Sequence, residues 1–485
     1  MGNTSMIQFF EWNLPNDGNH WKKLQEMVPE LAELGIHGVW IPPPTKAQNT
    51  DDVGYGAYDL WDLGEFEQKG AVRTKYGTRQ ELEAAIKEAR KYDVDIYADI
   101  VLNHKAGAEK TEKFLAKEVD PDNRELILTE PHDIEGWTKF EFPGRKGKYS
   151  DFKWHYYHFT GVDWDQKGQR KAIFLIEGDG KDWSDEVDQE MGNDDYLMFS
   201  DIDYQHPDVI EETKKWGAWI VKETGIAGFR IDAIKHFDAS FTKEFLDYVR
   251  SATGRENIFA VGESWKDDVG FLEDQLNFHE DKLSHFDIPF HSNFLQASKA
   301  GREYDMTQIF NDTLVSVKPL NAVTFVDNHD TQPGCALDAQ RVEDWFKPIG
   351  YALILLREAG YPCIFYGDMY GLNEPHEHPG FKDIITKLLE LRRDRAYGEQ
   401  NDYFDHPDTI GWVRRGDDEH PQGLAVVICT GDDGFKKMFV GEDHAGEKWI
   451  DLLGNKSDEE IEIGEDGFAE FKAVGGSVSA WGKKD

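Results

Sequence analysis

The sequence is poor in cysteine, in basic residues and in long apolar runs. Its three cysteines, Cys335, Cys363 and Cys429, form no spaced cluster and leave one unpaired, so they indicate neither a disulfide framework nor a zinc site. No run of 18 apolar residues occurs, and the N-terminus MGNTSMIQFFEW lacks the basic and apolar regions of a signal peptide. We therefore expect a cytoplasmic protein. The alternative is a secreted protein in its mature form with an added start methionine.

The deficit of basic residues leaves a strongly acidic chain. Asp and Glu outnumber Lys and Arg by 94 to 54, which gives a formal net charge of −40. Such a surface repels phosphate backbones and anionic lipids, so we expect neither a nucleic acid nor a membrane as partner. A neutral ligand such as a sugar polymer meets no such repulsion. Salt-adapted proteins are also acidic, although lysine remains plentiful here.

The length of 485 residues predicts two or three domains, and the 39% hydrophobic content suffices for a sizeable core. We expect a monomer.

Strand-like and helix-like runs alternate through most of the chain in eight strand-then-helix units, as a closed parallel barrel requires. The expected strands are 7–12, 37–42, 95–102, 228–233, 258–262, 286–290, 322–326 and 362–366. The expected helices are 21–35, 78–93, 206–225, 240–254, 268–279, 292–300, 344–358 and 381–396.

Two stretches depart from this alternation. Residues 103–206 are rich in aromatics, Asp, Gly and His, which predicts an inserted, irregular, β-rich domain after the third strand. Residues 397–485 carry short strands separated by Gly/Asp turns, which predicts a C-terminal antiparallel β-sandwich. The predicted fold is therefore α/β, a (β/α)8 TIM barrel formed by residues 1–102 and 207–396, with these two additional domains.

The stretch GFRIDAIKH, residues 228–236, places two charged residues inside an apolar strand. Because alternate side chains of a strand share a face, Arg230 and Asp232 point the same way. Burying a lone carboxylate costs several kcal/mol, roughly, unless a cation accompanies it. The guanidinium lowers the pKa of Asp232, which would hold it as an ionised, nucleophilic carboxylate. A structural ion pair inside a barrel explains this segment equally well.

Polar clusters lie at the carboxyl ends of four of the expected strands, where a parallel barrel has its active site. They contain Asp99, Asn103 and His104; Arg230, Asp232, Lys235 and His236; Glu263 and Trp265; and Asp327, Asn328, His329 and Asp330. Four clusters rich in carboxylates and histidine at one rim are hard to explain as core packing.

The segments DIVLNH, GFRIDAIKH, GESW and FVDNHD, in this order and spacing, resemble the four signature segments of the α-amylase family of glycoside hydrolases. The stretches VGYGAYDLWDLGEF, FPGRKGKYSDFKWH and FYGDMYG further resemble the bacterial liquefying α-amylases and their cytoplasmic relatives. The resemblance extends over nearly the whole chain, because the inserted domain and the terminal sandwich match the B and C domains of that family.

The resemblance implies retaining endo-hydrolysis of α-1,4-glucosidic bonds in starch, glycogen and maltodextrins. Asp232 would be the nucleophile that forms a glycosyl-enzyme, Glu263 the acid and base with a raised pKa, and Asp330 the third carboxylate. Only the resemblance selects Asp330 over Asp327. The implied substrate contacts are Tyr55, His104, Arg230, Lys235, His236, Trp265 and His329. Gly262 and Ser264 depart from the usual family segment around the acid, so the cleavage pattern stays open.

The resemblance also implies a calcium ion, which prefers carboxylate and carbonyl oxygens. Its ligands would be Asn103, Asp195, Asp201 and the backbone carbonyl of His236. The liquefying enzymes add a second metal cluster with further aspartates. Here Thr160, Ser184 and Gln205 stand at those positions, so we do not expect the second cluster.

Three alternatives remain. An oligosaccharide-forming or transglycosylating enzyme on the same barrel would differ in its products. A non-catalytic glucan-binding protein would typically lack a catalytic carboxylate, whereas all three are present. An anion- or nucleotide-binding barrel would conflict with the acidic charge, and the chain has no Gly-rich phosphate loop before a helix.

Overall fold

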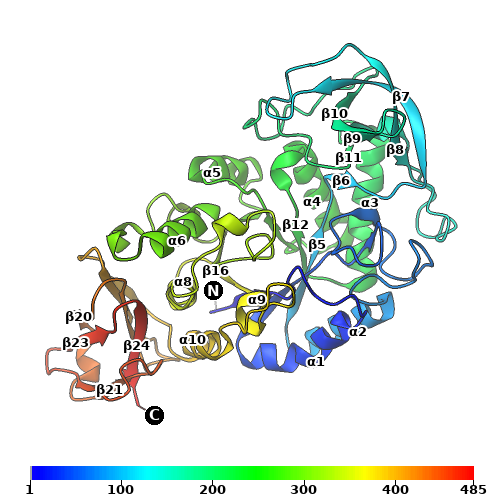
Figure 1. Ribbon diagram of the computed structural model, residues 1–485. Coiled ribbons are helices and arrows are strands. Elements are labelled where there is room, and N and C mark those ends of the chain that lie inside the picture. The colour runs from blue at the N-terminus through cyan, green and yellow to red at the C-terminus, as the bar shows by residue number, and fades with distance from the viewer. Residues whose placement is uncertain (1–2, 485) are drawn as a thin grey trace. The chain divides into compact units, whose positions relative to one another are not determined.

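The computed structural model describes residues 3–484, and its central element is a closed barrel of eight parallel strands (Figure 1). The order around the barrel is β1-β16-β15-β14-β13-β12-β5-β2. The barrel strands are β1 Ser5–Gln8, β2 Ile36–Ile41, β5 Asp95–Ile100, β12 Gly228–Ile231, β13 Phe259–Gly262, β14 Ser284–Phe286, β15 Ala322–Phe325 and β16 Tyr361–Phe365. The predicted TIM barrel is confirmed.

Amphipathic helices alternate with these strands. A capping box begins α2, since the Thr78 side chain accepts from the Glu81 amide and the Glu81 carboxylate accepts from the Thr78 amide. Leu82, Ile86 and Ala89 lie on the buried face of this helix. The main helices are α1 His20–Glu33, α2 Arg79–Lys91, α3 Pro207–Thr224, α4 Ala239–Thr253, α5 Val269–Phe278, α6 Ile288–Ala300, α8 Lys347–Leu355 and α10 Lys382–Asp394, and the shorter ones are α7 Leu314–Val317 and α9 Tyr366–Tyr370.

The expected strand 286–290 and helix 292–300 are wrong in their bounds. The strand β14 ends at Phe286, and α6 already begins at Ile288. Asp287 explains the change, because its carboxylate accepts from the amide of Phe290 at 3.1 Å and from the amides of Leu314 and Val315 at 3.0 and 2.7 Å. One buried carboxylate thus caps both α6 and α7, and the apolar run continues as a helix.

The inserted domain is an antiparallel sheet with strand order β6-β11-β9-β10-β7-β8 (Figure 1). Its strands are β6 His104–Lys105, β7 Lys110–Val119, β8 His132–Lys139, β9 Phe159–Asp165, β10 Arg170–Ile176 and β11 Ser200–Ile202. The hairpin of β3 Lys46–Ala47 and β4 Ala57–Asp59 precedes it in the chain. The first strand of the sheet follows β5 almost directly, so the residues that leave the barrel strand also start the inserted domain.

The C-terminal strands form a six-stranded antiparallel sheet, β17-β18-β19-β24-β21-β22, and a two-stranded sheet, β20-β23. Val413, Val427 and Trp481 of the larger sheet share one buried core with Met438 and Phe471 of the smaller one, which confirms the predicted sandwich. The strands are β17 Gln400–Tyr403, β18 Thr409–Arg414, β19 Leu424–Cys429, β20 Gly434–Phe439, β21 Lys448–Asp451, β22 Glu460–Glu462, β23 Phe468–Ala473 and β24 Ser477–Lys483.

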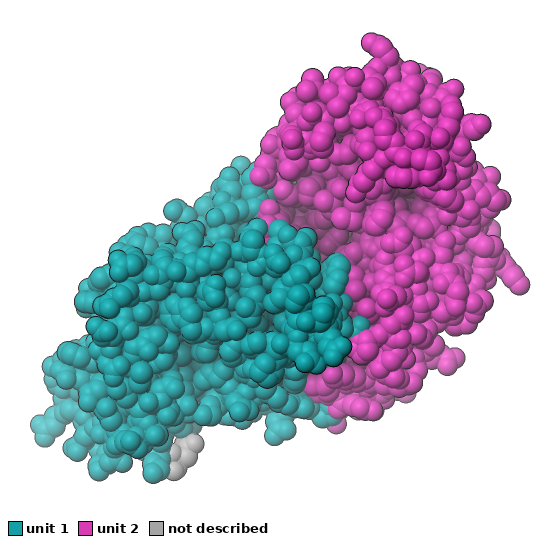
Figure 2. All heavy atoms as spheres, viewed as in Figure 1, with its two compact units in different colours: residues 1–14, 29–39, 266–485 teal, residues 15–28, 40–265 magenta. Residues whose placement is uncertain are grey.

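The chain divides into two compact units, coloured in Figure 2. Unit 1 comprises 1–14, 29–39 and 266–485, and unit 2 comprises 15–28 and 40–265. Within residues 3–484, every helix is too short or too polar to cross a membrane.

Candidate active site

The centre of the site in unit 2 is the buried guanidinium of Arg230. Its Nη1 lies 2.6 Å from Asp232 Oδ1 and 3.0 Å from Asp99 Oδ1, and its Nη2 lies 3.7 Å from Glu263 Oε2. The side chains of Asp232 and Glu263 remain 13% exposed, whereas Arg230 is 1% exposed. One guanidinium therefore holds two partly accessible carboxylates close together, with a buried third carboxylate behind it.

The register of the parallel strands brings these residues together. Arg230 pairs with Asp99 on β5 and with Val261 on β13, so the next residues along β12 and β13 reach the carboxyl ends of their strands side by side. Ala233 then adopts a left-handed conformation (φ 49°), and its amide donates to Glu263 Oε2 at 3.0 Å. The predicted common face of Arg230 and Asp232 agrees with their ion pair.

Asp99 is a site residue to which the sequence assigned no role. It is fully buried and accepts from Trp40 Nε1 at 3.0 Å and from the Tyr55 hydroxyl at 2.8 Å, besides its ion pair with Arg230. Burial raises the pKa of Asp99 to about 7, and the nearby charge of Asp232 adds to this. The available signal was a charged residue inside the apolar strand DIYADI. Asp99 thereby links the expected substrate residue Tyr55 to the Arg230 cluster.

His104 and Asn103 follow β5. His104 Nε2 lies 2.8 Å from the carbonyl oxygen of Tyr55, so Nε2–H donates, while Nδ1 faces the amide of Asn103 at 3.3 Å. Burial lowers the pKa of His104, which keeps the ring neutral. The structure thus brings Tyr55, His104, Arg230, Asp232 and Glu263 into one region of unit 2.

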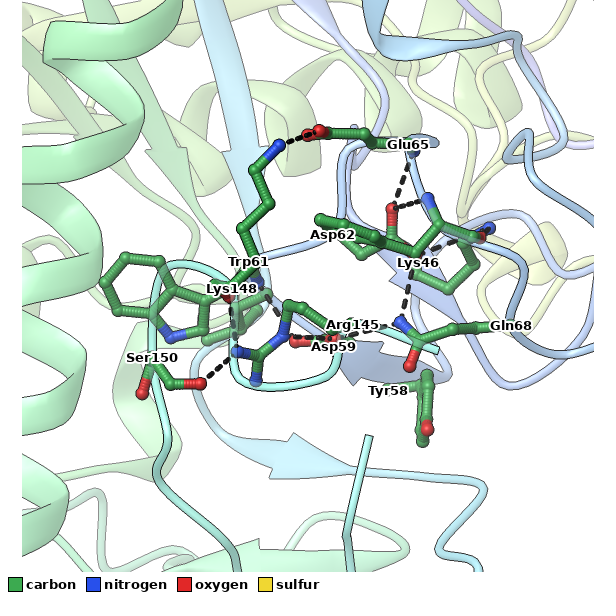
Figure 3. A network of polar contacts seen from close by, with 12 residues as sticks. Lys46, Tyr58, Asp59, Trp61, Asp62, Glu65, Gln68, Arg145, Lys148 and Ser150 are labelled. Atoms are coloured by element: carbon green, nitrogen blue, oxygen red, sulfur yellow. Dashed lines mark hydrogen bonds and ion pairs between the residues drawn. The ribbon is translucent and has the colours of Figure 1, made fainter. Parts of the chain in front are cut away.

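The loop that carries Tyr55 is fixed by a buried polar network (Figure 3). Arg145 Nε donates to Asp59 Oδ2 at 2.9 Å, and Gln68 Nε2 bridges Asp59 and Asp62 with two bonds of 3.0 Å. The ammonium of Lys46 lies within hydrogen-bonding distance of four backbone carbonyls, those of Phe66, Ala71, Val72 and Arg73, and 3.5 Å from Asp62. These bonds anchor the β3–β4 hairpin, on which Tyr55 is placed.

The expected site residues of unit 1 follow β15. The side chain of Asp330 is 26% exposed and its Oδ2 lies 3.5 Å from Nε2 of the buried His329. Asp327 differs, because it is buried, pairs with Lys347 at 2.8 Å and accepts from Thr331 Oγ1 at 2.8 Å. Lys347 also pairs with Asp368, which follows β16, so its ammonium connects the segment after β15 to the segment after β16. The accessible carboxylate of this segment is therefore Asp330.

Lys235 lies among acidic residues of the inserted domain. Its Nζ is 3.3 Å from Asp188, 3.5 Å from Glu190 and 3.4 Å from Asp194. These three acidic residues form a cluster whose oxygens lie within 4.8 Å of one another, so it could hold a metal ion, although the ammonium already neutralises part of its charge. His236 Nδ1 donates to the carbonyl of Asp194 at 2.6 Å, and burial lowers its pKa. Trp265 is partly exposed two residues beyond Glu263.

The expected calcium ligands provide a suitable set of oxygens. Asp195 and Asp201 are fully buried, and burial together with repulsion from neighbouring aspartates raises the pKa of both well above the ordinary value. Asn103 Nδ2 donates to Asp201 at 3.2 Å, while Asn103 Oδ1 is buried without a hydrogen-bond donor among the described residues. Two costly carboxylates and an unsatisfied amide oxygen fit a hard cation such as Ca²⁺.

A second cluster, His158, His206 and Asp208, does not fit a metal. His158 Nδ1 accepts from the His155 amide at 3.0 Å, and His206 Nδ1 accepts from the Asp208 amide at 3.2 Å. Both neutral rings therefore carry their proton on Nε2, which leaves neither ring a lone pair for a cation.

A cavity of about 290 Å³ opens in unit 2 beside β6 and β9. Its lining includes Trp137, Asp163, Trp164 and Phe199. Both indole Nε1 atoms donate to Gln166 Oε1, at 3.3 and 2.9 Å, which fixes the two rings beside each other. Aromatic faces with carboxylate and amide groups nearby suit an amphipathic neutral ligand.

The geometry and the sequence motifs agree with comparisons to known proteins. Residues 11–401 match the catalytic domain of alpha amylase. The chain is 51% identical over 482 residues to the alpha-amylase of Bacillus licheniformis, covering 99% of this chain and 93% of that protein. It is 51% identical over 484 residues to the glucan 1,4-alpha-maltohexaosidase of Bacillus sp. (strain 707), with the same coverage, and 43% identical over 493 residues to the cytoplasmic alpha-amylase of Escherichia coli (strain K12), covering 99% of both.

A parallel barrel with carboxylates at its carboxyl rim defines a class of barrel enzymes. Within that class, the chain belongs to the alpha-amylase family of glycoside hydrolases.

Proposed function

We propose that the protein hydrolyses internal α-1,4-glucosidic bonds of starch, glycogen and maltodextrins with retention of configuration. The observation that carries the proposal is the shared guanidinium of Arg230, which contacts both Asp232 and Glu263. A retaining mechanism needs two carboxyl groups close together on either side of one linkage. Both carboxylates are partly accessible, whereas the third partner of Arg230, Asp99, is buried.

In the first step, the Asp232 carboxylate attacks the anomeric carbon while the Glu263 carboxylic acid protonates the glycosidic oxygen. The carbon–oxygen bond breaks, the shortened glucan leaves as an alcohol, and an ester joins the sugar to Asp232. In the second step, the Glu263 carboxylate takes a proton from water, which attacks the same carbon and releases Asp232. Two inversions give net retention.

The remaining residues bind and orient the sugar. Asp330 is the third carboxylate and supports the positive charge that develops on the sugar ring, and His329 donates from the same segment. Tyr55 offers a ring for stacking, and His104 lies beside it. Lys235, His236 and Trp265 contact sugars beyond the cleaved bond.

One calcium ion would be held by Asn103, Asp195, Asp201 and the backbone carbonyl of His236. Because His236 bonds to the carbonyl of Asp194, the chain after β12 already lies against the loop that carries Asp195. When bound, the ion neutralises the two carboxylates and ties that loop to the end of β5. The hydroxyl of Thr160 donates to Asp201, and Lys181 pairs with Asp203, which supports a single ion rather than an adjoining cluster.

The test is hydrolysis of soluble starch, followed both by loss of iodine colour and by release of reducing ends. Internal cleavage removes the iodine colour while little reducing sugar has formed. Proton NMR of the first products of maltoheptaose should show the α-anomer. A protein without activity on amylose and maltoheptaose, or a β-anomeric first product, would contradict the proposal.

The second candidate is an oligosaccharide-forming hydrolase. The cavity lined by Trp137 and Trp164 favours it, because an additional binding surface for the glucan can set the length of the product, and one relative of 51% identity is a maltohexaosidase. One dominant product length from amylose, lost in Trp137→Ala, would support this candidate over a broad product mixture.

The partner is a neutral glucan, and we expect the enzyme to be a cytoplasmic monomer. The 43% identity to a cytoplasmic alpha-amylase supports the location.

A further inference from the structure

We propose that Gln8 is a positioning residue that fixes the tautomer of His329. Gln8 is the last residue of β1, and it is buried next to the segment that carries His329 and Asp330. The inference rests on the proposed function only in giving His329 and Asp330 a role at the sugar.

The polarity of one contact determines the position of the ring proton. Gln8 Nε2 lies 3.0 Å from His329 Nδ1. A side-chain amide nitrogen can only donate a hydrogen bond, so Nδ1 must accept. The neutral ring therefore carries its proton on Nε2.

That proton faces the proposed catalytic carboxylate. His329 Nε2 lies 3.5 Å from Asp330 Oδ2. With the proton on Nε2, the ring presents an N–H toward the Asp330 carboxylate and offers a donor to a hydroxyl of a bound sugar. In the other tautomer, an imidazole lone pair would face the negative oxygen, which is repulsive and gives the sugar no donor.

The ring itself is held in place by its neighbours. The ring centroid of Phe10 lies 5.0 Å from that of His329, and Trp12 stacks on His329 with 5.9 Å between ring centroids and an interplanar angle of 14°. The Trp12 amide in turn donates to Gln332 Oε1 at 2.9 Å. Since these contacts fix the plane of the ring, the hydrogen bond from Gln8 selects which nitrogen carries the proton.

The carboxylates of Asp330 and Glu11 lie close to the His329 segment, and Asp327, two residues before His329, is paired with Lys347. The carboxylate of Asp330 faces Nε2, as described. The buried carboxylate of Glu11 accepts from the Asn13 amide at 2.7 Å, from Gln332 Nε2 at 3.0 Å and from Asn373 Nδ2 at 2.6 Å. Glu11 is therefore hydrogen-bonded to other groups, and Asp330 is the carboxylate that the proton on Nε2 of His329 faces.

The test uses two substitutions of similar size. Gln8→Met removes the donor. Gln8→Glu replaces the donor with an acceptor, which favours a proton on Nδ1. Ring ¹⁵N NMR of the intact protein, with His329→Asn to assign the signal, should show Nε2–H in the wild type, a mixture of tautomers in Gln8→Met, and an Nδ1-protonated ring in Gln8→Glu.

The pH profile of kcat provides a readout that loss of packing would not change. In Gln8→Glu, the ring keeps Nε2–H only while it is doubly protonated. Its activity should therefore fall as pH rises and the ring loses that proton, on the order of tenfold at neutral pH. Gln8→Met should lose about threefold with a profile parallel to the wild type.

Thr324→Val is the matched control, because the buried Thr324 hydroxyl on β15 has no hydrogen-bond partner among residues 3–484. It should leave kcat and the pH profile unchanged. An Nδ1–H ring in the wild type would overturn the inference, as would equal losses in both Gln8 variants with parallel pH profiles. Since the NMR readout needs no substrate, an inactive wild type with the expected tautomer would refute the proposed function but not the positioning role.

Discussion

Replacing Arg230 with methionine should damage both stability and catalysis. The side chain is fully buried and neutralises Asp99 at 3.0 Å and Asp232 at 2.6 Å. Breaking a buried ion pair by removing one partner costs about 3–5 kcal/mol, because a charge is left uncompensated. Methionine fills similar space without replacing the charge, so this cost is mainly electrostatic.

The expected shift in melting temperature follows from the size of the chain. At about 2.1 cal/mol/K per residue, cooperative unfolding of 485 residues has an entropy of about 1 kcal/mol/K. A loss of about 3–5 kcal/mol then lowers Tm by about 3–5 °C, or about twice that if only half of the chain unfolds. Since Asp232 loses the group that orients it, kcat on maltoheptaose should fall about 100-fold or more, or about 2.7 kcal/mol.

Calorimetry and maltoheptaose kinetics of Arg230→Met, Asp99→Asn and the double variant separate the two effects. Removing the charge of Asp99 should restore at least about half of the lost stability, because less negative charge then remains buried, but it should not restore kcat. Arg145→Met is the matched control, since Arg145 is equally buried and pairs with Asp59 at 2.9 Å. It should lower Tm comparably with a far smaller loss of kcat. A wild-type Tm in Arg230→Met, or additive effects of the Asp99 and Arg230 substitutions, would refute the reasoning.

Three further predictions concern the acid and the metal. Glu263→Gln should fold normally and lose about 10²–10⁴-fold in kcat on maltoheptaose, and near wild-type turnover would mean that the acid is misassigned. Burial raises the pKa of Asp195 and Asp201, so their contribution to stability without a cation is present at low pH and is lost as pH rises above the unfolded value of about 3.8. The gap between the melting temperatures of calcium-saturated and chelated protein should therefore widen from about pH 5 to about pH 8, and a constant gap would contradict the assignment. Lys181→Met removes the ammonium that is paired with Asp203 and should lower Tm. Since this ammonium stands where a second ion would otherwise be needed, isothermal titration of the wild type should find one tightly bound calcium per chain rather than two.

Periodicity and alternation were sufficient for the barrel and for part of the site. The shared face of Arg230 and Asp232 follows from strand geometry alone, and their ion pair agrees with it. The strand expected at 286–290 was wrong because one carboxylate, Asp287, caps helices that begin in two different places. The cap on α6 is local, because Asp287 accepts from the amide of Phe290 three residues on and Pro289 lies in the first turn, so this helix start could have been predicted from the sequence. Only the cap that Asp287 contributes to α7 leaves no local pattern.

The choice between Asp327 and Asp330 shows the same limit. Strand alternation could not select either aspartate of FVDNHD, because both lie beyond the end of β15 at Phe325, and only the family resemblance separated them. In the structure Asp327 is buried against Lys347, which lies 20 positions along the chain, whereas Asp330 remains accessible. Gln8 and Asp99 were given no role for a similar reason, because each acts through a partner far away in the sequence, His329 and Arg230.

Buried cations are the scarce component in a chain with 94 acidic and 54 basic residues. Arg230 contacts three buried or partly buried carboxylates and Lys347 contacts two, so losing the cation leaves several charges unmatched, whereas losing one carboxylate leaves at least one intact pair. Asp195 and Asp201 break this pattern, since no lysine or arginine within the described range 3–484 forms an ion pair with either carboxylate. Two buried acidic groups without a protein cation remain charged at neutral pH only if a cation comes from solution. The physical case for the calcium site therefore lies in this missing partner as much as in the family resemblance.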